Sequence, residues 1–246
     1  METITCRLLP YAVADGALNM AADEALLHTA LDGTASLRFY GWSSATLSLG
    51  YFQPASLRHA DPLLATLSFV RRPSGGDALV HDQELTYALA LPVGTPWQTG
   101  GVSWLGRMHA IIAAALRKLG VETQLLEAGS ERPLDGPLCF RHLTPSDVLM
   151  KDAKIAGSAQ RKRRGALLQH GAILLARSAH TPSLPGIREL TSQDVHIEKL
   201  IQAVCAEFTR QTGWLLAPAN WIRRELDDTE ELAASKYRQK HWNEKR

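Results

Sequence analysis

The sequence predicts a single α/β domain, and two observations carry this prediction. Apolar residues recur at helical spacing over residues 17–31, 104–119 and about 194–212. Short apolar runs of strand length, bounded by turn-forming residues, lie between these segments. A chain of 246 residues suits one large domain, and no repeat, low-complexity segment or clear linker divides it. One domain spanning residues 1–246 is therefore expected.

The first helix is expected near the N-terminus, after a weakly alternating segment at residues 3–9 that predicts an edge strand. Asp15 is a suitable N-cap for a helix over residues 17–31, because its side chain can accept a hydrogen bond from a free backbone N–H. Asp23 and Glu24 lie within this helix, and the simplest interpretation places them on a solvated surface.

The strands at residues 36–42 and 46–52 are separated by a short serine-containing link, which predicts a hairpin. Further strands are expected at 67–72, 78–81, 84–91, 121–126, 147–150, 154–159 and 166–175. Gly120 is expected to end the helix over residues 104–119. The helix near 194–212 is expected to be capped within residues 191–194 and to end at Gly213.

Composition excludes several classes of protein. The chain is 45% hydrophobic and 21% charged, which is typical of a globular protein and not of a disordered or fibrous one. A net charge of +2 is too small to indicate nucleic-acid binding. No apolar run reaches transmembrane length, and the N-terminus does not resemble a signal peptide. The basic run at 161–164 predicts either a solvated face or a docking surface for an acidic protein.

The three cysteines, Cys6, Cys139 and Cys205, are widely spaced and form no CxxC motif. This spacing argues against a disulfide framework and against a zinc site, so free thiols in the cytoplasm and no metal are expected. Cys205 falls in a predicted helix, where packing is its expected role. Cys139 is the candidate nucleophile, because Lys154 follows one hairpin later and a nearby cation stabilises a thiolate. The alternatives are a buried cysteine and a solvent-exposed edge-strand lysine.

A second candidate site is the stretch Arg71–Ala78, in which a strand ends in Ser-Gly-Gly. The glycines allow a ligand to approach the backbone closely, and the two arginines can bind an anion. A hairpin turn with surface arginines is the alternative. His81 and His170 lie in or beside strands, where each can be either a proton shuttle or a structural histidine.

Taken together, five segments in order resemble the biotin/lipoate protein ligase superfamily. They are 19–27 (NMAADEALL), 37–42 (LRFYGW), 47–53 (LSLGYFQ), 71–76 (RRPSGG) with His81-Asp82, and 154–160 (KIAGSAQ). The resemblance implies a catalytic domain with a mixed central sheet flanked by helices, without a separate C-terminal accessory domain. It also implies an acyl tunnel, for which the expected lining and binding residues are Arg71, Arg72, Ser74, Gly75, Gly76, His81, Gly157, Ser158, Ala159 and His170. Asp77 departs from the family pattern and places a carboxylate beside the turn at residues 71–76.

Within the superfamily, Pro-Leu-Cys-Phe ahead of Lys-Ile-Ala-Gly-Ser-Ala-Gln is similar to the cysteine-dependent octanoyltransferases. This similarity implies that Cys139 carries an acyl thioester, that Lys154 is its partner, and that amides of residues 157–159 stabilise an oxyanion. The implied donor is octanoyl-acyl carrier protein, and the implied acceptor is a lysine of a lipoyl domain or of the glycine-cleavage H protein. No cofactor is expected, and the protein is expected to be a monomer.

Three alternatives stay open at this point. An ATP-dependent lipoate or octanoate ligase predicts acyl-adenylate formation and activity that survives Cys139→Ser. An octanoyl amidotransferase acting between lipoyl-domain proteins also uses a cysteine, although at another place in the fold. A non-catalytic binder of lipoyl domains predicts partner binding without acylation.

Overall fold

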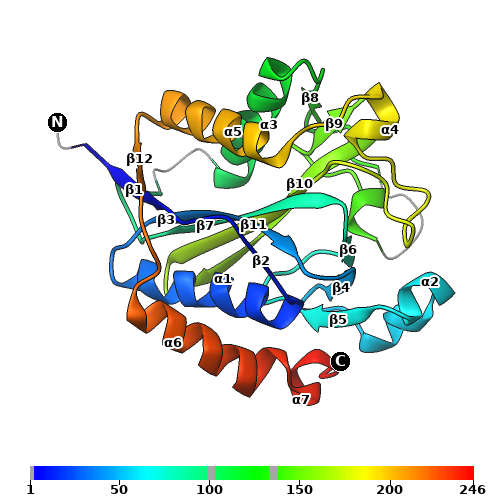
Figure 1. Ribbon diagram of the computed structural model, residues 1–246, viewed down its shortest axis with the longest axis horizontal. Helices are drawn as coiled ribbons and strands as arrows, with labels where there is room; N and C mark the ends of the chain where they lie inside the picture. The colour runs from blue at the N-terminus through cyan, green and yellow to red at the C-terminus, as the bar shows by residue number, and fades with distance from the viewer. Residues whose placement is uncertain (1–2, 99–102, 133–137) are drawn as a thin grey trace.

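The computed structural model describes residues 3–98, 103–132 and 138–246, and Figure 1 shows a large mixed sheet between two layers of helices. The strands of the large sheet follow the order β12-β1-β3-β7-β11-β10-β9-β8, and β2 pairs with β3 beyond the end of β1. Their bounds are β1 Thr5–Leu8, β2 Ala12–Ala14, β3 Ser36–Trp42, β7 Glu84–Leu91, β8 Gln124–Leu125, β9 Val148–Met150, β10 Ala153–Arg163, β11 Ala166–Leu174 and β12 Leu215–Pro218. A small sheet holds β5 (Ser68–Arg71), β4 (Thr46–Leu49) and β6 (Leu79–His81), in that order.

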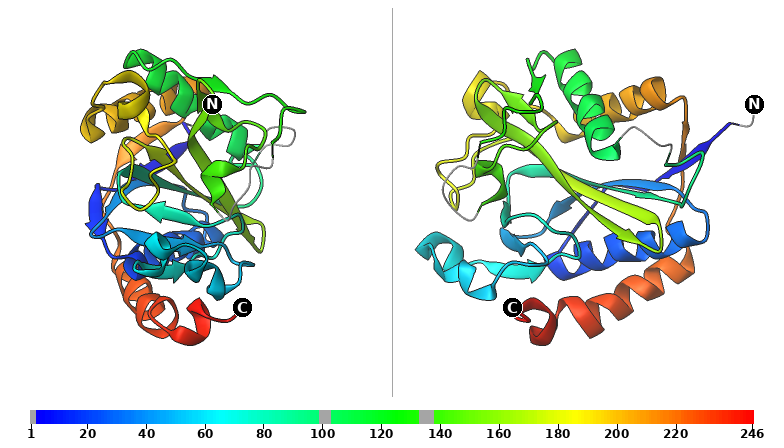
Figure 2. Two further views of the ribbon diagram at one scale, coloured as in Figure 1. Left: turned by 90° about the vertical axis from the view of Figure 1, so that its right-hand side faces the viewer. Right: turned by 180° about the vertical axis from the view of Figure 1, so that it is seen from behind.

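The helices cover both faces of the large sheet, as the two further views in Figure 2 also show. One face packs against α3 (Trp104–Lys118) and α5 (Ile197–Thr212), which contribute apolar residues to the largest core cluster. The other face packs against α1 (Gly16–Leu31), and α6 (Arg223–Leu232) covers the outside of α1. Shorter elements are the 3-10 helices η1 Ala55–His59 and η2 Cys139–Arg141, helices α2 Pro62–Ala65, α4 Ile187–Thr191 and α7 Lys240–Asn243, and a π-helical turn η3 Ala233–Tyr237.

Several local predictions are confirmed. Asp15 Oδ1 accepts a hydrogen bond from the Leu18 amide at 2.8 Å and caps α1. Gly120 follows α3 with φ +81°, a conformation that glycine adopts easily. β9, β10 and β11 are consecutive antiparallel strands, as expected. No helix within the described ranges is both long and apolar enough to cross a membrane.

The predicted hairpin between residues 36–42 and 46–52 is wrong. β3 belongs to the large sheet, whereas β4 is the central strand of the small sheet and pairs with β5 and β6. Leu47 and Leu49 are fully buried in a cluster that includes Val80 of β6 and Leu138, which precedes η2. The chain therefore leaves the large sheet at the link, because burial in a second cluster outweighs pairing between sequence neighbours.

Three further predictions also fail because of contacts made far along the chain. Residues 3–9 do not form an edge strand, since β12 pairs in parallel with the outer side of β1. Asp23 and Glu24 are buried and not solvated, because Asp23 faces the sheet and bonds Tyr40 and His170, whereas η3 packs over Glu24. The helix near 194–212 begins at Ile197 after His196, while residues 187–191 form a separate short helix.

Candidate active site

Cys139 lies in the single turn of η2, which is joined to β6 through the backbone. Leu138 forms a parallel bridge with Ala78, and the Cys139 amide donates to the Ala78 carbonyl at 2.8 Å. The cysteine side chain is half-buried. This arrangement holds the sulfur at one end of a pocket while its own amide is already hydrogen-bonded.

Lys154 is the neighbour of Cys139 that the sequence predicted. It lies on β10 with only 6% of its surface exposed, and its ammonium has three close neighbours. Nζ is 2.7 Å from Asp147 Oδ2, 3.1 Å from the His142 carbonyl oxygen and 3.9 Å from Cys139 Sγ. An ammonium has three N–H donors, so these neighbours account for all of them and aim one at the sulfur.

Asp147 is a residue of this site that the sequence analysis missed. It is 1% exposed, and its Oδ2 also accepts hydrogen bonds from the Thr144 amide at 2.7 Å and from the Thr144 hydroxyl at 3.0 Å. The sequence did contain a signal for Asp147, which lies just before β9. The β9–β10 hairpin brings β10, and Lys154 with it, back beside the start of β9. Asp147 therefore anchors Lys154 beside Cys139.

Gly157 makes room for the lysine. A Cβ at this position would lie 2.5 Å from Lys154 Cε and 3.1 Å from Nζ. Because a Cβ contact below 3.0 Å requires displacement of one of the groups, a larger residue at 157 would move the ammonium. Glycine at 157 thus has a steric role, because the absence of a side chain leaves room for Lys154.

A pocket crosses the sheet from the Cys139 end. Gly157 on β10 pairs with Ala172 on β11, Ala172 pairs with Thr86 on β7, and Thr86 pairs with Tyr40 on β3. All four line the pocket, whose empty volume, its open mouth included, is about 420 Å³. The surface it presents is almost entirely apolar. Of the residues predicted for the site, it is lined by Arg72, His81, Cys139, Gly157, Ser158, Ala159 and His170.

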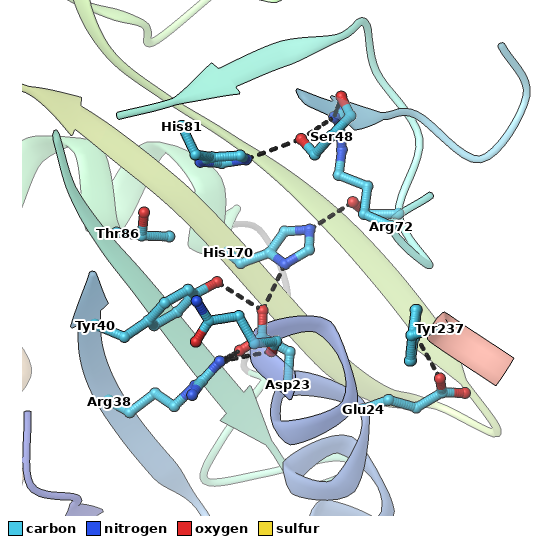
Figure 3. A network of polar contacts seen from close by, with 12 residues as sticks. Asp23, Glu24, Arg38, Tyr40, Ser48, Arg72, His81, Thr86, His170 and Tyr237 are labelled. Atoms are coloured by element: carbon cyan, nitrogen blue, oxygen red, sulfur yellow. Dashed lines mark hydrogen bonds and ion pairs between the residues drawn. The ribbon is translucent and has the colours of Figure 1, made fainter. Parts of the chain in front are cut away.

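The polar side chains in the wall are hydrogen-bonded to one another. His81 Nε2 is 2.9 Å from Ser48 Oγ (Figure 3). Its Nδ1 is 2.7 Å from Glu84 Oε1, and its ring stacks on Trp42 at 3.8 Å. Burial lowers the pKa of His81, although Glu84 opposes this shift. His81 is therefore held as a neutral, oriented ring, and a wall of paired polar groups leaves the pocket suited to an apolar ligand.

His170 belongs to a buried network centred on Asp23, drawn in Figure 3. His170 Nδ1 is 2.8 Å from Asp23 Oδ2, and its Nε2 is 2.5 Å from Ser74 Oγ. Asp23 also accepts from Tyr40 Oη at 2.9 Å and from Arg38 Nε at 2.9 Å. Burial raises the pKa of Asp23, but Arg38 and His170 outweigh it, so that the pKa lies below its usual value. This network fixes one end of the pocket.

His109 is another residue that the sequence analysis missed, since it sits inside the apolar stripe of α3. Its Nδ1 is 2.7 Å from the Ser146 carbonyl oxygen, and its Nε2 is 2.6 Å from Ser158 Oγ. Because a carbonyl only accepts, Nδ1 carries the proton and Ser158 donates to Nε2. Burial lowers the pKa of His109. The ring therefore orients Ser158 from the opposite face of the sheet.

The structure corrects the expectation that Arg71 lines the acyl pocket. Its guanidinium is fully buried and donates to the backbone carbonyls of Gly50 at 2.9 Å, Gln53 at 2.6 Å and Asn243 at 2.9 Å. Arg71 thus ties the C-terminal segment to β4. Arg72 does line the pocket, with Nη2 donating to the Gly75 carbonyl at 3.0 Å and Nη1 to Ser48 Oγ at 3.1 Å.

The Ser74–Gly76 turn lies outside the residues that line the pocket, which corrects the expectation for Ser74, Gly75 and Gly76. Gly76 has φ +83°, and its carbonyl oxygen would lie 1.7 Å from a Cβ placed on Gly50. From outside the pocket, the turn orients Arg72 through the Gly75 carbonyl and His170 through the Ser74 hydroxyl. Asp77 is also outside the lining, with Oδ1 3.2 Å from Gln53 Nε2 and Oδ2 3.5 Å from His142 Nε2.

The amides of residues 157–159 do not all face the same way. Backbone groups alternate between the two edges of a strand, so Ser158 faces the edge opposite to Gly157 and Ala159. Ser158 pairs with Gly171 of β11. The pairing of β10 with β9 ends at Ala156. Beyond Ala156, β9 therefore leaves one edge of β10 uncovered.

Comparison with known proteins decides the family. Residues 15–181 match the lipoyl protein ligase A/B catalytic domain. Octanoyltransferase LipM of Kyrpidia tusciae is 32% identical over 271 residues, covering 97% of this chain and 98% of its own. Octanoyltransferase LipM of Bacillus subtilis is 32% identical over 279 residues and both chains are fully covered. This chain belongs to the lipoyl protein ligase A/B catalytic domain family.

Solved structures of the family confirm the fold. A putative lipoate protein ligase from T. acidophilum with bound lipoic acid superposes with a TM-score of 0.79 at 22% identity, covering 99% of this chain and 100% of that one. A lipoate-protein ligase A bound with ATP gives the same TM-score and identity, covering 98% and 99%. The expected mixed α/β architecture is thereby confirmed. Among the residues described, no cluster of three or more His, Cys, Asp or Glu side chains could hold a metal ion.

Proposed function

We propose that this protein is a cysteine-dependent octanoyltransferase. It would move an octanoyl group from octanoyl-acyl carrier protein to a lysine of a lipoyl domain or of the glycine-cleavage H protein. The observation that carries the proposal is the Lys154 ammonium 3.9 Å from Cys139 Sγ, at one end of an apolar pocket. The octanoyltransferases to which the chain is similar over nearly their full length support it.

In the first half-reaction the Cys139 thiolate attacks the carbonyl carbon of the octanoyl thioester. The C–S bond to Cys139 forms, the bond to the carrier thiol breaks, and the carrier thiolate leaves and takes up a proton. Lys154 stabilises the attacking thiolate through charge, because its third N–H points toward the sulfur. The amides of residues 157–159 are the proposed donors for the oxyanion, since they lie where β9 no longer covers the edge of β10.

In the second half-reaction a neutral lysine amine of the acceptor attacks the enzyme thioester. The amide bond forms, the bond to Cys139 breaks, and the amine loses a proton as the thiolate is restored. Neither step uses ATP or a metal ion. The apolar pocket holds the octanoyl chain between the two steps, where each methylene removed from water contributes about 0.8 kcal/mol.

The basic run at 161–164 is proposed to dock the protein partners. Arg161, Lys162 and Arg164 are exposed, and β10 extends from the active site to Arg163. The charge of Arg163 is partly neutralised within the protein, because its Nη1 lies 3.6 Å from Glu24 Oε1. An exposed cationic rim on the active-site strand would speed encounter with an acidic carrier or lipoyl domain. Three free cysteines agree with a place in the reducing cytoplasm.

The proposal is tested by intact mass after mixing the purified protein with octanoyl-acyl carrier protein in the absence of ATP. One octanoyl adduct is expected, cleaved by hydroxylamine and absent in Cys139→Ala. Cys205→Ala is the matched control, because it removes a helical cysteine outside the pocket and should still be acylated. A lipoyl domain that is modified only when free octanoate and ATP are supplied would establish a ligase and contradict the proposal.

A further inference from the structure

The far end of the acyl pocket is closed by residues of α1 and β3, and this closure has a defined distance from Cys139. Cys139 packs against a buried cluster of Phe140, Ala172 and Leu174, so the row of paired residues is followed from Ala172 of β11. From Ala172 the register runs to Thr86 on β7 and then to Tyr40 on β3. These two steps between neighbouring strands span roughly 9–10 Å, at about 4.8 Å each.

An octanoyl chain matches this span. From carbonyl carbon to terminal methyl it extends roughly 9 Å, at about 1.25 Å per bond along the axis of a tetrahedral carbon chain. An acyl group on Cys139 that follows the row of paired residues would therefore place its methyl end beside Tyr40. The residues along this path, Ala172 and Thr86, are small, whereas the residues at its end are large.

Two large side chains form the end of the pocket. Tyr40 is fully buried, and its hydroxyl is held by Asp23 Oδ2 at 2.9 Å. Met20 is 2% exposed and lies three residues before Asp23 on α1, so the two share one helix face. Tyr40 is fixed by its hydrogen bond and by Arg38, whose guanidinium carbon is 3.8 Å from the ring centre. Met20 has no such polar anchor and packs in a cluster with Val70 and Tyr237.

We infer that Met20 sets the upper limit of the acyl chain length, with Tyr40 as the fixed wall beside it. This inference rests on the proposed function and adds the residue that determines its specificity. Shortening Met20 would open space toward Val70 for additional methylenes, whereas Tyr40 would stay in place. One methylene in a hydrophobic pocket changes selectivity by about 10- to 200-fold, so a single substitution at this position is enough to be measured.

The test is a competition experiment read by intact mass. Equimolar octanoyl, decanoyl and dodecanoyl thioesters of acyl carrier protein are offered to wild type and to Met20→Ala, and the ratio of adducts on Cys139 is measured. Met20→Ala is expected to raise the ratio of decanoyl to octanoyl adduct at least about tenfold. The matched control is Met108→Ala, because Met108 is fully buried on the opposite face of the sheet and should leave the ratio unchanged.

A second variant protects the test against misfolding. Met20→Val removes less volume and should shift the ratio in the same direction by a smaller factor. An unchanged ratio in a folded Met20 variant would overturn the inference, as would an equal shift in Met108→Ala. The proposed function would fail separately, and this inference with it, if wild type formed no adduct with any donor or if the adduct persisted in Cys139→Ala.

Discussion

The Asp147 carboxylate and the Lys154 ammonium form a buried ion pair, with Oδ2 and Nζ 2.7 Å apart and side chains only 2% and 3% exposed. This pair decides where the cation of the candidate active site lies. Removing one partner from a buried pair typically costs about 3–5 kcal/mol, because the remaining charge loses its compensation. Asp147 is therefore a positioning residue for Lys154.

Asp147→Asn is accordingly expected to lower stability, because Asn preserves the shape of the side chain and removes its charge. A loss of about 3 kcal/mol corresponds to a fall in Tm of roughly 6–12 °C for a chain of this size. The double variant Asp147→Asn with Lys154→Gln should regain part of the loss, since no buried charge remains. Thermal unfolding of wild type, the two single variants and the double variant measures the coupling between Asp147 and Lys154. Additive effects of the two substitutions on stability would contradict this coupling.

Gly157→Ala should impair acylation while leaving the fold largely intact. The new Cβ would displace the flexible end of Lys154, not the backbone, so the ammonium would move away from Cys139. We expect the rate of octanoyl adduct formation to fall at least about tenfold, the effect of losing roughly 1.4 kcal/mol. Gly75→Ala is the control, because its Cβ would make ordinary contacts with Phe52 at 3.9 Å. Equal rates for both variants would refute the steric role.

Cysteine labelling should be selective for Cys139. Burial raises the pKa of Cys6 to about 12 and that of Cys205 to about 11, so both remain protonated near neutral pH and react slowly. One iodoacetamide adduct is therefore expected at pH 7.5, and none in Cys139→Ala. Lys154→Met should slow the modification about tenfold through loss of the neighbouring charge. Labelling of Cys6 or Cys205 at a rate similar to that of Cys139 would disprove the predicted selectivity.

Stability should fall with acidification through the buried histidines. Burial lowers the pKa of His81 and His109, so the folded protein favours their neutral forms. The unfolded chain takes up protons below about pH 6.5, the ordinary histidine value, and therefore gains stability relative to the folded state. Their contribution is complete above that pH and is lost as the pH falls toward the lowered pKa values.

Tm measured from pH 8 to pH 5 tests this expectation. His109→Gln should flatten the decline, whatever its effect on Tm at pH 8, since one of the two groups no longer titrates. The exposed His241→Gln is the control and should keep the slope of wild type. If His109→Gln and wild type lost Tm in parallel, the proton linkage assigned to His109 would be wrong.

Local chemistry allowed much of the fold to be predicted. Helical periodicity located α1, α3 and most of α5, and the run at 84–91 gave the bounds of β7. The hairpin between β3 and β4 was predicted wrongly for a physical reason, because a short link does not determine whether the next strand stays in the same sheet. The small sheet depends on burial of Leu47 and Leu49 against residues distant in sequence.

The amino-acid sequence by itself determined the family motifs, the candidate pair Cys139 and Lys154, and the local caps and turns, since these depend on residues close along the chain. Only the tertiary structure decided that Asp147 holds Lys154, that Arg71 ties the C-terminal segment, and that Asp23 and Glu24 are buried. It also decided that Met20 and Tyr40 line the pocket. The physical reason is that charge pairing and burial depend on contacts through space, which strand register and helix packing create and spacing along the chain does not reveal.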